Sequence, residues 1–269
     1  MPEVDGVGYS ETTGVKLEHL SMIISMHLAV TQAVLHKNAR YHQHYRYIDL
    51  TAGKGYSPTG QTGSPLVFLE HAESDKMSFP YYADFVEVNP TNVEALKAAI
   101  NRETTQRGWR CRHVRVHTGR YQEIVPTILP ASVDANELGL VFIDPSGDLP
   151  DFDTLKYIAA KRPRMEILIY ISTTNIKRLY QYRHKLLSNY MAEIGKVYWL
   201  VRKPIPRDPH KWTFLLGSNT NLFKDYRKID FLRLDSDDAQ KFFPTLNLTA
   251  RQRREQNQPR LLDAETPEM

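Results

Sequence analysis

The sequence of 269 residues contains one cysteine, Cys111, and this scarcity limits what the chain can build. A single thiol can form no intramolecular disulfide and no cysteine-rich metal site. Long hydrophobic runs are also missing, since none approaches the ~20 residues that span a bilayer. The first five residues lack the basic and then apolar pattern of a secretory signal. We therefore expect a cytoplasmic protein with no membrane segment and no bound metal.

Charge of one sign is not in large excess either. The 35 lysines and arginines stand against 31 aspartates and glutamates, which leaves a net charge of +4. The composition, with 41% hydrophobic and 25% charged residues, is that of an ordinary globular protein. A chain of this length can bury a substantial core, so one large domain is expected. The charge permits a nucleic-acid partner without requiring one, because the clustering of basic residues decides that question.

Apolar residues recur at helical spacing from Leu17 to Leu28, which predicts a helix over residues 15–37. Short apolar runs then alternate with helical patterns, as they do in proteins with a parallel sheet and helices on both faces. The predicted strands cover residues 46–50, 79–88, 112–117, 138–143 and 166–171, and the predicted helices cover 64–70, 90–100, 121–129, 151–161 and 175–194.

The pattern changes after residue 194. Two further apolar runs, 197–201 and 212–216, have only a proline-rich loop between them, so no crossover helix fits and the strands must pair antiparallel. The sequence therefore predicts a single α/β domain with a Rossmann-like, seven-stranded, mostly parallel sheet, helices on both faces and a C-terminal antiparallel hairpin. Residues 1–14 are polar and are expected to form a loose arm.

Polar residues stand where three of these strands end. After the first strand come Asp49 and then two glycines, Gly53 and Gly55, which can adopt positive φ and let a ligand approach the backbone. Glu87 ends the second strand, where a carboxylate can accept the hydroxyls of a ribose, and Val88 beside it can pack on an adenine ring. Ordinary roles remain open: a glycine-rich turn common to α/β proteins, and an acid that favours the start of the next helix.

Two common nucleotide motifs are absent from this turn. A dinucleotide fingerprint needs a third glycine where Pro58 stands. A phosphate-binding loop needs a lysine where Gln61 stands, and without that cation the contact to the β- and γ-phosphates is lost. A nucleoside ligand without phosphates fits the sequence better.

The order of these features resembles the class I S-adenosylmethionine-dependent methyltransferases over residues 45–218. Within that class the chain is most similar to the three-Cys-motif partner proteins of bacteria and phages. The similar features are Lys16 in the N-terminal helix, Tyr47-Ile48-Asp49-Leu50-x-Ala52-Gly53-x-Gly55, Gly63-Ser64-Pro65, Phe142-Ile143-Asp144-Pro145-x-Gly147, and Trp212-x-Phe214-Leu215-x-Gly217-x-Asn219.

The resemblance implies a cofactor, S-adenosyl-L-methionine, and a set of residues that hold it. Those residues would be Asp49, Thr51, Gly53, Gly55, Glu87 and Val88. Together with the polar composition of both ends of the chain, it leads us to expect an N-terminal arm and helix packed on the core (1–44), a methyltransferase-like domain (45–245) and a polar, flexible tail (246–269). The cell would be a bacterium or a phage-infected bacterium.

Asp144 and Pro145 are the candidate catalytic residues. In amino-group methyltransferases an Asp or Asn side chain and the carbonyl of the following proline accept hydrogen bonds from the two N–H groups of the substrate amine. Those enzymes usually continue with a second proline and an aromatic residue, whereas here Ser146 and Gly147 follow. Tyr56 could supply the missing ring from the other wall. The alternative is a plain strand-ending turn, since Asp-Pro and Ser-Gly both favour turns.

Basic residues interleaved with aromatic ones mark the predicted helix 175–194 and the hairpin loop. Lysines and arginines in such an arrangement bind phosphates while rings stack on bases, although a charged helix is often only a solvated face. The candidate nucleic-acid-binding residues are Lys177, Arg178, Arg183, Lys185, Arg207 and Lys211.

Two hypotheses follow from the sequence. The first is an S-adenosylmethionine-dependent methyltransferase that acts on nucleic acid, at a base nitrogen held by Asp144 and Pro145. The second is a catalytically silent subunit with a methyltransferase fold that binds nucleic acid or another enzyme. Ser146 and Gly147 favour the second, while the glycine turn and Glu87 favour the first.

Overall fold

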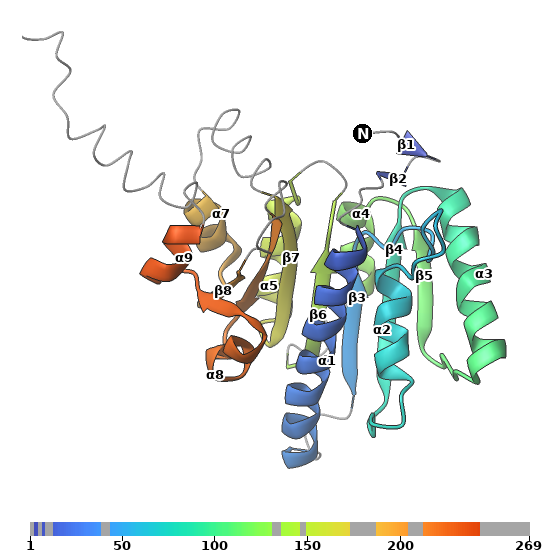
Figure 1. The fold of residues 1–269 in the computed structure, drawn as a ribbon, viewed down its shortest axis with the longest axis horizontal. Helices are drawn as coiled ribbons and strands as arrows, with labels where there is room; N and C mark the ends of the chain where they lie inside the picture. Colours follow the sequence, from blue (N-terminus) through green and yellow to red (C-terminus); the bar gives the residue numbers. More distant parts are fainter. Residues whose placement is uncertain are drawn as a thin grey trace, which may run out of the picture.

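The computed structural model describes residues 3–4, 7–8, 13–38, 44–130, 136–145, 149–172, 187–203 and 212–242. The elements form three layers, with one large sheet between two layers of helices (Figure 1). The strands of this sheet are β3 (Tyr45–Asp49), β4 (Tyr81–Glu87), β5 (Val114–Thr118), β6 (Leu138–Ile143), β7 (Met165–Ser172), β8 (Tyr198–Arg202), β9 (Trp212–Ser218) and β10 (Phe231–Arg233).

The strand order is β10-β8-β9-β7-β6-β3-β4-β5. The five strands that are adjacent in the sheet as β7, β6, β3, β4 and β5 pair in parallel. The strands β9, β8 and β10 extend the sheet beyond β7 in antiparallel pairs. This arrangement confirms the predicted fold class, including the antiparallel pairing of the two runs after residue 194. The strand count was wrong, because the described part of the chain holds eight strands in this sheet rather than seven.

The missed strand, β10, is only three residues long. It follows Asp230, which adopts a left-handed backbone with φ of 65°, and among the described strands it pairs with β8 alone, at the edge of the sheet. Three residues are too few to show an alternation of apolar and polar side chains, so periodicity could not predict this strand.

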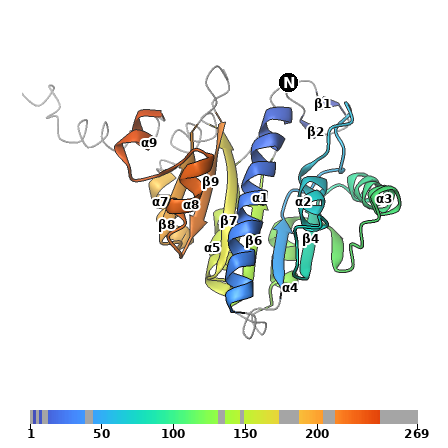
Figure 2. The same ribbon diagram turned by 60° about the horizontal axis from the view of Figure 1, so that its bottom comes forward.

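Of the described helices, four pack on one face of the sheet and four on the other; Figure 2 shows these two layers. On one face lie α1 (Thr13–Lys37), α2 (Ser64–Ala72), α3 (Pro90–Arg107) and α8 (Phe223–Tyr226), which the 3-10 turn η1 (Arg227–Ile229) follows. On the other face lie α4 (Tyr121–Ile128), α5 (Phe152–Lys161), α7 (Leu187–Ile194) and α9 (Asp237–Phe242). Helix α7 is the C-terminal part of the predicted helix 175–194, whose remainder lies outside the described residues. In the N-terminal arm, β1 (Glu3–Val4) and β2 (Val7–Gly8) form a short antiparallel pair.

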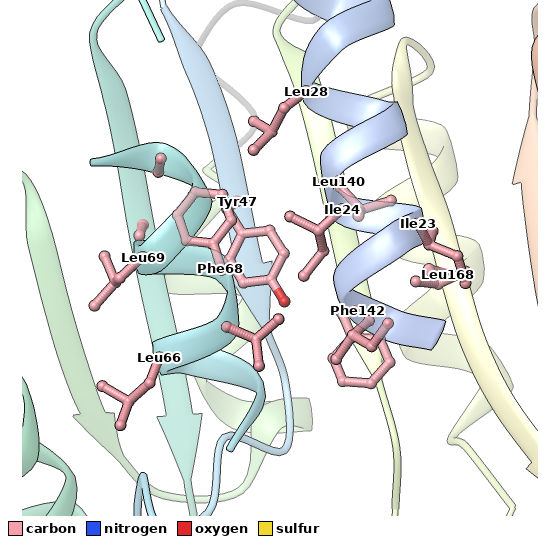
Figure 3. Close-up of a cluster of buried hydrophobic side chains, with 14 of the residues drawn as sticks. Ile23, Ile24, Leu28, Tyr47, Leu66, Phe68, Leu69, Leu140, Phe142 and Leu168 are labelled. Carbon is pink, nitrogen blue, oxygen red and sulfur yellow. The ribbon is translucent and has the colours of Figure 1, made fainter. Parts of the chain in front are cut away.

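Helix α1 is held over the centre of the sheet by its apolar face. Ile23, Ile24 and Leu28 point toward the sheet and are almost completely buried (Figure 3). Beside them the rings of Tyr47 in β3 and Phe68 in α2 stack with their centroids 3.9 Å apart. Each fully buried side chain of this kind contributes about 1.5–3 kcal/mol. This packing fixes α1 along the sheet, and its first turns lie at the carboxyl ends of the central parallel strands.

Within the described part of the chain, no helix is both long and apolar enough to cross a membrane.

The register of the two central strands gives a test of the fold. Gly139 in β6 lies opposite Arg46 in β3, and a Cβ added to Gly139 would lie 1.9 Å from the Arg46 carbonyl oxygen. Because this oxygen belongs to the backbone of the sheet, it cannot move away without disturbing the strand. We expect Gly139→Ala to lower the free energy of unfolding, measured in urea, by at least about 2 kcal/mol.

Gly14 in α1 provides the matched control, because its added Cβ would meet only the end of the Gln61 side chain, at 3.0 Å. Gly14→Ala should change the free energy of unfolding by no more than about 0.5–1 kcal/mol. Equal unfolding midpoints for the two variants would contradict the pairing of β6 with β3.

Candidate functional site

A cavity of about 740 Å³ opens at the carboxyl ends of β3, β4 and β6. The chain runs from β3 outward to β4 and β5, and then returns to β6 on the other side of β3. Such a reversal of strand order leaves a crevice, and this is where open α/β sheets bind their ligands. The volume lies within the range of small-molecule sites. The lining comes from the start of α1, the turn after β3, the ends of β4 and β6, and the segments 119–122 and 149–151.

The two glycines of the first turn have different roles. Both adopt positive φ, +66° at Gly53 and +86° at Gly55. A Cβ added to Gly53 would meet no atom within 4 Å, so the turn leaves open space beside this residue, which lines the cavity. A Cβ added to Gly55 would lie 2.9 Å from the Cβ of Ala99, so Gly55 allows the turn to pack on α3. Only Gly53 has the open surroundings that close approach of a ligand requires.

Asp49 is completely buried beneath this turn and is not among the described residues that line the cavity. Its Oδ1 accepts a hydrogen bond of 3.0 Å from the backbone N–H of Thr51, and its Oδ2 accepts one of 2.6 Å from the Ser64 hydroxyl. Gly63 is the N-cap of α2, so the hydroxyl of Ser64, the next residue, is available to Asp49. Asp49 therefore joins the first turn to the start of α2.

Burial dominates the electrostatics of Asp49. Loss of solvent raises the pKa of its carboxyl from 3.8 to about 7. The hydrogen bonds from Ser64 and Thr51 oppose this rise in pKa, while the nearby carboxylates of Asp144 and Glu87 add to it. A group with these surroundings can change its charge near neutral pH when a charged ligand enters the cavity.

Glu87 ends β4 and holds the glycine turn from the other side. Its Oε2 accepts a hydrogen bond of 2.9 Å from the backbone N–H of Gly53. Its Oε1 accepts one of 2.8 Å from the backbone N–H of Asn89 and a longer one of 3.4 Å from the Asn92 side chain. A carboxylate has about four acceptor positions, so one remains on Oε2 and the weak bond to Asn92 can be exchanged. Val88, which is 61% exposed, offers an apolar surface next to it.

Asp144 follows β6 and meets the first turns of α1 across the cavity. The Lys16 ammonium lies 2.5 Å from the Asp144 Oδ2, and the two side chains are 20% and 18% exposed. The backbone N–H of Asp144 donates a hydrogen bond of 2.8 Å to the Thr51 hydroxyl, which fixes the turn after β6 to the turn after β3. Lys16 also lies 5.0 Å from the centre of the Tyr170 ring. The candidate catalytic carboxylate is therefore both anchored and paired with a cation.

Tyr56 lines the cavity, but its hydroxyl is engaged on the side of α3. It donates a hydrogen bond to Glu103, and the Arg102 guanidinium lies 4.2 Å from the centre of its ring. The ring is thus held between the glycine turn and α3. Its hydroxyl is committed to Glu103, so any role for Tyr56 toward a ligand would come from its ring.

Apart from Asp49, the predicted cofactor and catalytic residues all line this one cavity: Thr51, Gly53, Gly55, Tyr56, Glu87, Val88, Asp144 and Pro145. The predicted nucleic-acid-binding residues Lys177, Arg178, Arg183, Lys185, Arg207 and Lys211 lie outside the described residues, as do Ser146 and Gly147.

Sequence reasoning missed three residues that belong to the site. Lys16 entered only as a feature of a resemblance, without a role. Asn92 lies in the first turn of α3, which begins directly after Asn89. A side chain in that turn can reach back to the end of the preceding strand, so its position could have suggested the contact with Glu87. Tyr121, whose hydroxyl accepts a hydrogen bond of 2.8 Å from the backbone N–H of Asp151, carried no signal in the sequence.

No protein-family model matches the chain, and no curated protein sequence matches it. Among solved structures, protein LPL1258 of Legionella pneumophila superposes with a TM-score of 0.53 at 14% identity, over 84% of this chain and 91% of that one. Spermidine synthase of Thermotoga maritima gives 0.48 at 13% identity over 87% and 75% of the two chains. A human methyltransferase 10 domain containing protein gives 0.47 at 12% identity over 76% and 84%. The likeness to the Legionella protein shows the fold alone, which is the Rossmann-like α/β arrangement described above.

The raised pKa of Asp49 predicts a particular dependence of stability on pH. Between about pH 4 and pH 7 the folded protein retains a proton at Asp49 that the unfolded chain has lost. The free energy of unfolding should therefore fall as the pH rises through this window, because the folded state binds more protons than the unfolded state.

Asp49→Asn keeps the shape of the side chain and removes its charge, so it should remove this contribution. The stability of the wild type relative to the variant should decline from pH 4 to pH 7 and then level off, as measured by urea unfolding at each pH. A difference that stays constant across this range would refute the assignment of a protonated, buried Asp49.

Proposed function

We propose that the protein is an S-adenosylmethionine-dependent methyltransferase that acts on nucleic acid, at a base nitrogen held by Asp144 and Pro145. One observation carries the proposal: two carboxylates flank the glycine turn of β3 at the carboxyl edge of the sheet. Glu87 ends β4 and Asp144 follows β6, and both strands are direct neighbours of β3. Two strand spacings separate these ends by roughly 10 Å. A ligand with a nucleoside at one end and a reactive group at the other can bridge that span.

The lining suits this cofactor. Gly53 leaves room for a ligand at the backbone, Glu87 retains an acceptor position for a ribose hydroxyl, and Val88 presents an apolar surface to a purine ring. The buried Asp49 keeps the turn in place from below. The positive amino group of the methionine portion would favour the ionised form of its carboxyl. The cofactor would supply an electrophilic methyl group on a sulfonium.

Asp144 and Pro145 would orient the acceptor. A carboxylate oxygen and a backbone carbonyl can each accept a hydrogen bond from one N–H group of an exocyclic amine. These two hydrogen bonds would direct the nitrogen lone pair toward the methyl group. Most of the acceleration in such a site comes from alignment. The Lys16 cation on Oδ2 balances the charge of Asp144, and the hydrogen bond to Thr51 holds the Asp144 backbone beside the first turn.

The second candidate is a catalytically silent subunit with a methyltransferase fold that binds nucleic acid or another enzyme. The contact of 2.5 Å between Lys16 and Asp144 favours it, because a cation already occupies an oxygen that a substrate amine would need. Ser146 and Gly147, in place of a proline and an aromatic residue, favour it as well. Both candidates retain the cofactor pocket, so only an assay of methyl transfer separates them.

Cofactor binding can be tested at Gly53, for which the chain offers a closely matched control. Gly53 and Gly60 both adopt positive φ, +66° and +82°, and an added Cβ would meet no atom within 4 Å at either position. Only Gly53 lines the cavity. In calorimetric titrations, Gly53→Val should abolish binding of S-adenosylmethionine and Gly60→Val should preserve it, although both carry similar backbone strain. Normal affinity in Gly53→Val would remove the cofactor from this turn.

Methyl transfer is tested at Asp144 with labelled cofactor on mixed DNA and RNA. Asp144→Ala should lower the rate by about 10²–10⁴, the range usual for a positioned acid–base or orienting group, while cofactor affinity stays within a few fold. Asp144→Asn retains an oxygen that can accept an N–H bond and should keep a larger part of the rate. If Asp144→Ala methylates normally, the residue belongs only to a turn. If the wild type binds cofactor but transfers nothing to any nucleic acid, the partner-subunit hypothesis replaces the enzyme.

A further inference from the structure

The β5 edge of the sheet carries an unusual concentration of positive charge. Between residues 107 and 120 the sequence has five arginines, two histidines and no acidic residue. The segment therefore has a formal charge of +5, whereas the whole chain has +4, so the remaining residues together carry 4 − 5 = −1. Basic charge that appears modest over the whole chain is thus gathered on one short segment, which covers the end of α3, the strand β5 and the turn after it. Arg107, at the end of α3, pairs with Glu70 and Glu103, so the other four arginines carry the charge of the edge.

This segment lies at an open edge. Within the described residues, β5 is the last strand in the order of the sheet and pairs with β4 alone (Figure 1). Arg110, Arg112 and Arg120 are exposed, and none of them forms an ion pair within the part of the chain that the structure describes. Arg115 is 59% exposed and lies 3.9 Å from Asp84.

The carboxylate of Asp84 does not neutralise the edge. It is completely buried, and its oxygens contact Arg46 as well as His117, whose Nε2 lies 2.6 Å from Oδ1. Arg115 is the third basic side chain near this one carboxylate, and it is the farthest from it. The positive charge of Arg115 therefore remains largely available to a ligand in solvent.

The edge connects two hollows. At the amino end of β5, Arg110, Arg112 and His113 line a depression of about 410 Å³. At the carboxyl end, Arg120 lines the main cavity next to Gly119, whose N–H donates a hydrogen bond to the carbonyl of Glu87. From Arg112 to Arg120 the chain advances eight residues, or at most about 26 Å at the rise of a strand. The arginines are thus spread along this edge, from the depression to the rim of the candidate active site.

We infer that the β5 edge binds the phosphate backbone of a nucleic acid and guides it to the rim of the cavity. The inference rests on the proposed function and deepens it, because it assigns a surface to the substrate. Arginine suits the task, since its planar guanidinium can bind phosphate oxygens with two parallel hydrogen bonds. Contacts of this kind set the position of the polymer without reading its sequence. Charged residues also keep sheet edges from pairing with one another, and the experiment separates that role from binding.

The test compares two double variants that remove the same charge from opposite edges of the sheet. Arg110→Gln with Arg112→Gln changes the β5 edge. Lys228→Gln with Arg233→Gln changes the β10 edge, where each cation is exposed and paired with its own aspartate. Binding of labelled single-stranded RNA, single-stranded DNA and duplex DNA is measured by fluorescence anisotropy at several salt concentrations. Comparison of the three affinities shows which polymer the protein prefers.

Each phosphate contact contributes about 0.7–0.9 to the slope of log K against log salt. With two arginines removed, we expect the slope of the β5 variant to be smaller in magnitude by about 1.4–1.8 and the slope of the β10 variant to be unchanged. Equal slopes in the β5 variant and the wild type would overturn the inference, as would an equal fall in both variants. A change confined to self-association of the β5 variant, seen by sedimentation, would also overturn it and leave the edge with a protective role.

A third double variant and a titration keep the two proposals apart. If the slope falls only when Arg178 and Lys185 are both changed to Glu, nucleic acid binds elsewhere, so the edge inference fails while the proposed function stands. Titration of the wild type with S-adenosylmethionine is independent of all these slopes. A wild type that binds nucleic acid along β5 but does not bind the cofactor would overturn the proposed function and leave the edge inference intact.

Discussion

The site depends on one buried carboxylate. Asp49 receives hydrogen bonds from the Thr51 N–H and the Ser64 hydroxyl, and Thr51 in turn accepts a hydrogen bond from the backbone of Asp144. Asp144 pairs with Lys16, so a single connected set of polar contacts joins α2, β3, β6 and α1. In a buried setting such contacts strengthen one another, and each unpaired member would be costly. The cavity therefore has a fixed shape because its walls are tied together from beneath.

The apolar core positions the partners in this network. Ile23 and Leu28 fix α1 over the sheet, and this places Lys16, two turns before Ile23, beside the end of β6. The stacked rings of Tyr47 and Phe68 hold α2 beside β3 in the same layer. The chemistry of the cavity is thus built by elements that are far apart in sequence, and hydrophobic packing fixes their mutual positions before any ligand binds.

Sequence reasoning succeeded where the signal was local. The strand and glycine turn around Gly53, the acid Glu87 at a strand end, and the helix start at Asn89 are each encoded within a few residues. It failed where a role depends on distant partners. Lys16 and Asp144 are 128 positions apart, Ser64 and Asp49 are 15 apart, and no periodicity links either pair. The basic β5 edge was missed for another reason. The net charge of the whole chain is small, and it hides the excess of positive charge on this one segment.

The buried Asp49 also bears on the choice between an enzyme and a silent subunit. A carboxyl whose pKa is raised to about 7 by burial lowers the stability of the folded protein at and above neutral pH, relative to an uncharged side chain. A fold that needed only a turn between β3 and α2 could use Asn there without that penalty. The negative charge gains a use when a cationic ligand lies above the turn, because such a ligand favours the ionised form. The buried carboxyl of Asp49 thus favours a cationic ligand above the turn, as the proposed cofactor would be, whether the protein is an enzyme or a silent subunit. What separates the two functions then lies on the Asp144 side of the cavity, where Lys16 holds Oδ2 and where Ser146 and Gly147 replace the usual proline and aromatic residue.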